Sequence, residues 1–187
     1  LGHGPADFSF TLRRKKLNYI FENLPKVREE FGDDEPLFVY THILAPHPPF
    51  VFGRQGQPMK SRAAFGFADG SHWLDMHGQD DDSYRQRYAD QAAWIMKRLA
   101  ETIDEILASA PRESIIIIQG DHGPGSELAW ENIDLTNHFE RLGIFNAWYV
   151  SSGQKVPLYD GQTAMNTFPI LFNSIFNSQW PMQDDRV

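Results

Sequence analysis

The sequence contains no cysteine among its 187 residues. This absence excludes disulfide bonds, thiolate metal sites, iron–sulfur clusters and cysteine nucleophiles. Basic residues are in the minority, since 17 Lys and Arg stand against 25 Asp and Glu, and the formal net charge is −8 at pH 7. Because sequence-independent binding to nucleic acid needs a basic face, we expect no nucleic acid partner. No apolar run approaches the roughly 18 residues of a membrane-spanning helix, so we expect no transmembrane segment in this chain.

The rest of the composition is that of an ordinary globular domain. Hydrophobic residues make up 41% of the chain, charged residues 22% and aromatic residues 13%. These fractions exclude a disordered tail, a collagen-like repeat and a coiled coil. A chain of this length is typical of one domain and long enough to bury a core. We therefore expect residues 1–187 to form a single domain.

Several segments have the apolar spacing of amphipathic helices. Within residues 12–31, apolar side chains recur at intervals of three and four, and Pro25 is expected to kink or divide that helix. A short helix is expected over residues 128–141. A last helix is expected over residues 163–176, disturbed by Pro169.

The strongest helix is expected over residues 83–109. It is expected to start at a capping box that begins with Ser83, and Pro111 is expected to stop it. The long stretch before it, residues 53–82, has five glycines and no clear periodicity. A loop of that length inside a domain is more often functional than decorative.

Three short segments have the composition of buried strands. Residues 37–44 are rich in β-branched and aromatic side chains, residues 114–119 contain four consecutive isoleucines, and residues 144–150 are again apolar. A continuous apolar run without alternation is typical of a central strand covered on both faces. Helices and strands alternate along the chain, which predicts an α/β fold with a layered sheet and helices on both faces.

Two of these strand ends have residues suited to chemistry. Asp121 and His122 follow the isoleucine strand, and His42 and His47 lie within and just after the segment at 37–44. Sites in α/β sheets form beyond the carboxyl ends of strands. A carboxylate beside an imidazole is a ligand pair that suits Zn²⁺ or Mn²⁺. It suits Mg²⁺ and Ca²⁺ less well because of the imidazole.

Simpler roles exist for each of these residues. Asp121 could cap the next helix and His122 could be a core residue. His47 could be an ordinary surface residue in its proline loop, while His42 could be structural. His138 falls on an expected helix, where a solvated or capping role is usual.

Several motifs resemble the alkaline phosphatase/sulfatase superfamily. Residues 115–123 look like its metal-binding strand end, and residues 45–50, Ala-Pro-His-Pro-Pro-Phe, resemble the histidine loop that precedes it. The more specific resemblance is to bacterial membrane-anchored sulfatase-like proteins, the lipoteichoic acid synthase-like and phosphoethanolamine transferase-like enzymes. It covers about residues 12–178. Three further segments are similar: Tyr88-Ala89-Asp90-Gln91, Asn166-Thr167-Phe168 and Leu171-Phe172-Asn173.

The resemblance implies a partial alkaline phosphatase-like fold and a role for each candidate residue. Asp121 and His122 match paired metal ligands, so a divalent metal ion is the implied cofactor. His47 matches the histidine that contacts a phosphate or sulfate group, with a catalytic role, and His42 lies near a second substrate-binding histidine. His138 is a looser match to a further histidine.

The resemblance also has gaps. The family's nucleophile and an earlier acidic ligand have no counterpart here, and residues 1–11 are too few to supply them. We therefore expect the C-terminal part of a sulfatase-like domain, a metal-dependent hydrolase or phospho-group transferase that is not active alone. The implied substrate is an anionic phosphate or sulfate ester. The implied location is the extracytoplasmic face of a bacterial membrane, periplasmic or cell-surface, with a membrane-anchored parent protein.

Two other interpretations remain open. The chain could be a non-catalytic binding or assembly module derived from the sulfatase-like fold. It could also be an unrelated α/β protein in which Asp121 is a helix cap.

Overall fold

A computed structural model describes residues 5–59, 66–78, 80–110 and 112–185. The chain divides into two compact units, one formed by Leu1–Pro111 with Gly123–Gly143 and the other by Arg112–His122 with Ile144–Val187. We call them the helical unit and the hairpin unit, and each is described on its own. The expectation of a single domain over residues 1–187 stays a prediction.

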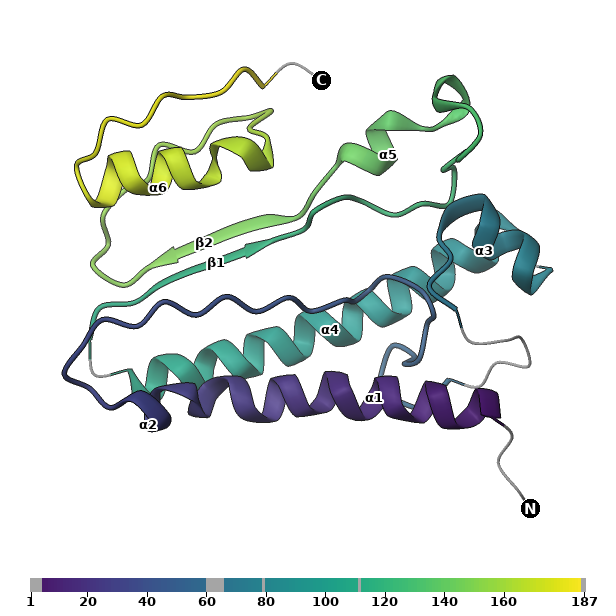
Figure 1. Cartoon of the computed structure of the whole chain (residues 1–187), viewed down its shortest axis with the longest axis horizontal. Helices are drawn as coiled ribbons and strands as arrows, with labels where there is room; N and C mark the ends of the chain where they lie inside the picture. The colour runs from purple at the N-terminus through teal and green to yellow at the C-terminus, as the bar shows by residue number, and fades with distance from the viewer. Residues whose placement is uncertain (1–4, 60–65, 79, 111, 186–187) are drawn as a thin grey trace. The chain divides into compact units, whose positions relative to one another are not determined.

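Two long helices dominate the helical unit. They are α1 (Pro5–Asn23) and α4 (Asp81–Ser109), and Figure 1 shows them side by side. The helix predicted over residues 12–31 is confirmed, and it starts earlier than expected. It is divided where Pro25 was expected to act, because Leu24–Lys26 forms a 3-10 turn before the short α2 (Val27–Phe31).

The core between α1 and α4 is largely aromatic. Phe52 stacks on Trp94 at 3.7 Å between ring centroids, and Phe21 meets Trp94 edge-on at 5.9 Å. Each fully buried side chain of this kind stabilises the fold by roughly 1.5–3 kcal/mol. The buried members of this cluster are Phe10, Leu17, Phe21, Val51, Phe52, Trp94 and Ile95.

The helix predicted over 83–109 is confirmed, but the residue that caps it differs. The side chain of Asp80 accepts a hydrogen bond from the Ser83 amide at 2.8 Å, so Asp80 is the N-cap and Ser83 lies inside the first turn. The stretch predicted as irregular contains α3 (Gly70–His77), which ends at Gly78 in the left-handed region. The helix predicted over 128–141 is shorter than expected. It consists of a 3-10 turn, Ile133–Leu135, and α5 (His138–Leu142).

The hairpin unit contains the sheet. Its strands are β1 (Ile115–Gln119) and β2 (Asn146–Val150), which pair antiparallel with Ile117 opposite Trp148. A 3-10 turn, Ala164–Asn166, leads into α6 (Thr167–Ile175). Pro169 falls in the first turn of α6, where a missing amide hydrogen disrupts no helical hydrogen bond, so the helix is not disturbed.

The predicted fold class is wrong. Over the described ranges the sheet has two antiparallel strands and helices predominate, so the layered α/β sheet with helices on both faces, and the partial alkaline phosphatase-like fold, are not formed. Residues 37–44 are extended but join no strand ladder in those ranges, and Phe38 and Tyr40 are 77% and 78% exposed. Ile115 is 37% exposed, so β1 is not a central strand. β-branched composition favours an extended backbone, but pairing and burial depend on partners that apolar runs do not specify.

Candidate functional site

The loop that holds His47 is fixed from α4 by Gln91, which is fully buried. Its side-chain oxygen accepts hydrogen bonds from the backbone amides of Val51 at 2.7 Å and Phe52 at 3.2 Å. Its side-chain nitrogen donates to the carbonyl oxygens of Pro46 at 3.1 Å and His47 at 3.4 Å. The amide side chain of Gln91 thus pairs with both amides and carbonyl oxygens of the loop backbone. The prolines of this loop have no amide hydrogen with which to donate hydrogen bonds of their own.

A second side chain supports the same loop from α1. Arg13 donates hydrogen bonds to the carbonyl oxygens of Leu44 and, at 3.1 Å, His47. His47 itself is 20% exposed at its side chain. The loop is therefore held between two helices while the imidazole keeps access to solvent.

A buried carboxylate lies behind His47. Nε2 of His47 is 4.0 Å from Oδ2 of Asp69, whose side chain is only 4% exposed. Arg141 on α5 donates to the same Oδ2 at 2.8 Å, and the Tyr84 hydroxyl on α4 donates to Oδ1. Trp130 donates its indole N–H to the Asp69 carbonyl oxygen at 2.9 Å. We call His47, Asp69, Tyr84 and Arg141 the carboxylate cluster.

The electrostatics of the carboxylate cluster keep Asp69 ionised. Burial by itself raises the pKa of Asp69, but hydrogen bonds from Tyr84 and Arg141 and the nearby charges of His47 and Arg141 outweigh burial, and the pKa lies below its ordinary value. Burial, and then the charge of Asp69, raise the pKa of Tyr84 well above its ordinary value. The Tyr84 hydroxyl therefore stays protonated and continues to donate.

Residues 125–140 of the helical unit are tied to α4 beside the carboxylate cluster. Arg85 donates to the Ser126 hydroxyl at 3.0 Å and to the Glu127 carboxylate, and Ser126 donates to Glu140. The Gly125 amide donates to the Tyr84 hydroxyl at 3.4 Å. These bonds place α5, and with it Arg141, against Asp69.

The hydrogen bonds of His47 also define its reactive atom. Nδ1 lies 2.6 Å from the Pro48 carbonyl oxygen, which can only accept, so Nδ1 carries the proton. Nε2 is then the atom that exchanges a proton or contacts an anion. Oδ2 of Asp69 is the nearest carboxylate oxygen to this atom among the described contacts, but the 4.0 Å between them is beyond hydrogen-bond distance.

Asp121 and His122 lie in the hairpin unit, just beyond β1. Oδ1 of Asp121 accepts a hydrogen bond from the His122 amide at 3.0 Å, and Oδ2 of Asp121 is 3.6 Å from His122 Nε2. The side chains are 76% and 31% exposed. A carboxylate oxygen and an imidazole nitrogen so close together, and accessible, suit a borderline divalent metal ion as two of its ligands. Within the ranges that the structure describes, no group of three or more His, Cys, Asp or Glu could hold a metal ion.

The two remaining histidine candidates are both in the helical unit. His42 is exposed on the extended segment and lines a cavity against α1. His138 is the first residue of α5, and its Nε2 lies 2.9 Å from the Ile133 carbonyl oxygen, a contact within its own loop. The structure thus brings neither of them into the carboxylate cluster.

Sequence reasoning missed three members of the carboxylate cluster. Asp69 precedes a helix in a stretch predicted as loop, and Tyr84 and Arg141 fell within predicted helices. Nothing local distinguishes these side chains, since their meeting depends on long-range packing. Gln91 was part of a segment similar to the family, although its role as the support of the histidine loop was not predicted.

Comparison of the chain with protein-family models, curated proteins and solved structures yields no match. The sulfatase-like resemblance therefore stays a prediction that rests on its motifs. No helix in the described part of the chain is both long and apolar enough to cross a membrane.

Proposed function

We propose that this chain is part of a metal-dependent hydrolase or transferase that acts on phosphate or sulfate esters. The observation that carries the proposal is the carboxylate cluster, in which a buried Asp69 backs the accessible imidazole of His47. An imidazolium held beside a fixed carboxylate is a group that can bind an anion and deliver a proton. The motif resemblance supplies the substrate class, since it assigns His47 to a phosphate or sulfate group.

His47 has two tasks in this proposal. Its Nε2–H donates to an anionic oxygen of the ester, or to the oxygen that leaves, while Nδ1 remains bonded to Pro48. Gln91 and Arg13 hold the loop backbone, so the ring keeps its position as the proton moves. Asp69 compensates the charge of the ring without taking its proton.

Asp121 and His122 are proposed as two ligands of a divalent metal ion, Zn²⁺ or Mn²⁺ in preference to Mg²⁺ or Ca²⁺. Such an ion, when bound, would polarise the ester oxygens and lower the pKa of a coordinated hydroxyl group. Their mutual contact at 3.6 Å places the oxygen and nitrogen donors on one side of the strand end. The extracytoplasmic location and the membrane-anchored parent protein belong to the same proposal and rest on the resemblance.

Metal titration tests the metal ligands. Zn²⁺ and Mn²⁺ are titrated by calorimetry into the chain and into the double variant Asp121→Ala/His122→Ala, with His72→Ala/Asp75→Ala as the matched control. We expect the first variant to lose metal binding and the control to keep it. Equal metal uptake by the double variant and the parent would show that the site is misassigned.

Binding of 4-nitrophenyl phosphate and 4-nitrophenyl sulfate tests His47. Loss of one charge-assisted hydrogen bond should weaken binding by about tenfold in His47→Ala. His72→Ala, which removes an exposed imidazole elsewhere, should leave binding unchanged. Ester binding that depends on neither the metal ligands nor His47 would favour the non-catalytic module.

A further inference from the structure

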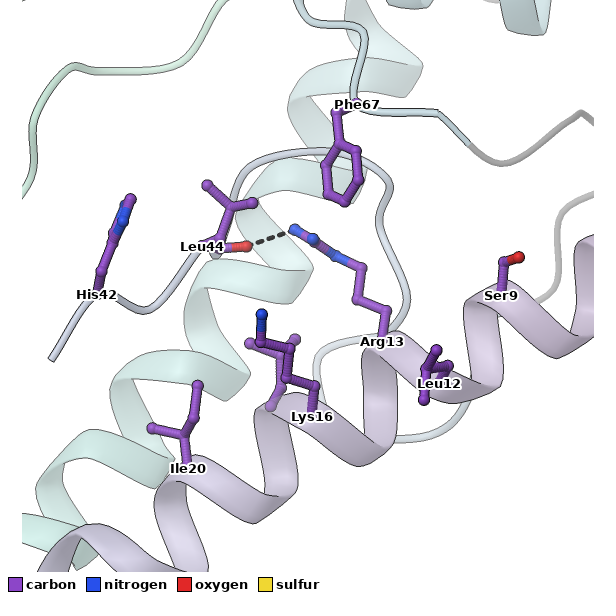
Figure 2. A pocket seen from close by; sticks show the side chains of 9 residues that line it. Ser9, Leu12, Arg13, Lys16, Ile20, His42, Leu44 and Phe67 are labelled. Atoms are coloured by element: carbon purple, nitrogen blue, oxygen red, sulfur yellow. Dashed lines mark hydrogen bonds between the residues drawn. The ribbon is translucent and has the colours of Figure 1, made fainter.

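A cavity of about 310 Å³ lies between α1 and the extended segment before the histidine loop. Figure 2 shows Arg13 and Lys16 on α1, His42 and Leu44 on the extended segment, and Phe67 with its ring toward the Arg13 guanidinium. All of these residues belong to the helical unit. The volume is at the lower end of the range usual for small-molecule sites, roughly 300–1,000 Å³.

The cavity wall has a basic and an apolar part. Three side chains are basic, Arg13, Lys16 and His42, and none of the described lining residues is acidic. The apolar part is formed by Leu12, Leu17, Ile20, Leu44 and Phe67. Such a wall matches a ligand with one anionic end and an aliphatic body.

Arg13 is the strongest indication of a ligand. Its side chain is 8% exposed, and burial lowers its pKa to about 10, which leaves it charged at neutral pH. The described residues offer this guanidinium two carbonyl oxygens and the face of Phe67, 5.0 Å away, but no carboxylate forms an ion pair with it. Its Nε is buried and has no hydrogen-bond partner there. A buried cation without a counter-ion is costly, and an anion in the adjoining cavity would offset that cost.

We propose that this cavity binds an amphipathic anion, an aliphatic chain whose carboxylate or phosphate head lies against Arg13 and Lys16. Carboxylate and phosphate share the oxygen geometry that a guanidinium recognises. The aliphatic part lies along Leu12, Ile20 and Phe67. This site does not depend on the metal ligands or on the His47 imidazole, since Arg13 contacts only the backbone of His47.

Calorimetric titration with single compounds below their micelle concentrations tests the ligand class. Decanoate and decyl phosphate represent the two heads, decanol removes the charge, and acetate and inorganic phosphate remove the chain. We expect decanoate, decyl phosphate or both to bind more tightly than all three controls. The decyl anion that binds more tightly shows whether the cavity prefers a carboxylate or a phosphate head group. The proposal is overturned if decanol, or acetate and inorganic phosphate, bind as tightly as the decyl anions. It is also overturned if neither decanoate nor decyl phosphate binds.

Variants locate the binding. Lys16→Glu and Leu12→Glu place a negative charge in the cavity wall at exposed positions, so the fold should survive. Each should weaken decyl anion binding by about tenfold or more. Lys15→Glu makes the same charge change as Lys16→Glu, but on the exposed surface of α1 beside the residues that line the cavity. It should leave the affinity for the decyl anions within about twofold of the parent's. If both Lys16→Glu and Leu12→Glu bind the decyl anions as tightly as the parent, the proposed location is refuted. The variant Asp121→Ala/His122→Ala should keep the parent's affinity for the decyl anions, which makes this test independent of the metal test.

Discussion

Arg141 donates a hydrogen bond of 2.8 Å to Oδ2 of Asp69, although 72 residues separate them in the sequence. The same carboxylate oxygen is 4.0 Å from Nε2 of His47. One buried acid thus joins α5, the start of α3 and the histidine loop. The candidate site consequently depends on a contact that no local segment contains.

Removing the charge of Asp69 should destabilise the protein strongly. In Asp69→Asn, the Arg141 guanidinium, 18% exposed, loses its counter-ion and the Tyr84 hydroxyl loses a charged acceptor. Breaking a buried pair from one side costs about 3 kcal/mol or more, which we expect as a lower free energy of unfolding in urea. Asp75→Asn, on the exposed side of α3, should change it by less than about 0.5 kcal/mol. Similar values for the two variants would exclude a structural role for the Asp69 charge.

The same carboxylate should make stability depend on pH in the acid range. The pKa of Asp69 in the folded protein lies below its ordinary value of 3.8, so its stabilising contribution is complete above that value. The contribution is lost as the pH falls through the lower folded pKa. The difference in unfolding free energy between the parent and Asp69→Asn should therefore be constant from about pH 7 to pH 5 and shrink below about pH 4. A difference that stays constant down to pH 2 would contradict this account.

Gln91 should be required for the order of the histidine loop. In Gln91→Leu, which keeps side-chain length close to that of glutamine, the buried amides of Val51 and Phe52 lose their acceptor. We expect a loss of about 3 kcal/mol and faster hydrogen exchange at the Val51 amide. Gln86→Leu changes an exposed glutamine on the same helix and should leave Val51 protected. Unaltered exchange in Gln91→Leu would mean that other contacts suffice to hold the loop.

Two glycines on either side of Asp121 and His122 should respond differently to alanine. A Cβ at Gly123 would lie 2.0 Å from the Glu140 carbonyl oxygen and 2.9 Å from that of Gly143, both backbone atoms. Gly123→Ala should therefore cost about 2–3 kcal/mol through displacement of α5. At Gly120 the nearest atom, the His122 carbonyl oxygen, is at an ordinary 3.5 Å, so Gly120→Ala should be nearly neutral. Thermal unfolding of both variants compares them directly, and equal melting temperatures would refute the steric argument.

The sequence predicted most elements because their signals are local. Apolar spacing identified α4 and the divided first helix, and β-branched runs identified β1 and β2. The Asp80 cap and α3 were missed, because several side chains near residue 80 could cap equally well and a short helix leaves little periodic signal.

For the same reason, only some of the candidate residues could be selected from the sequence. His47, Asp121 and His122 could be selected from their motifs, and His122 does lie beside Asp121 because neighbours in sequence cannot be far apart. Asp69 in a predicted loop and Arg141 in a predicted helix could not be selected, since each has the same local sequence pattern as a solvated charged residue.

The sequence alone determined the absence of thiol chemistry, the acidic charge and the positions of the main helices and strands. These follow from composition and from periodicities of two and 3.6 residues. Only the tertiary structure decided that β1 pairs with β2 in an antiparallel hairpin, and that a buried Asp69 faces His47. Strand partners and buried ion pairs depend on the free energy of packing distant segments together, and no single segment determines that free energy.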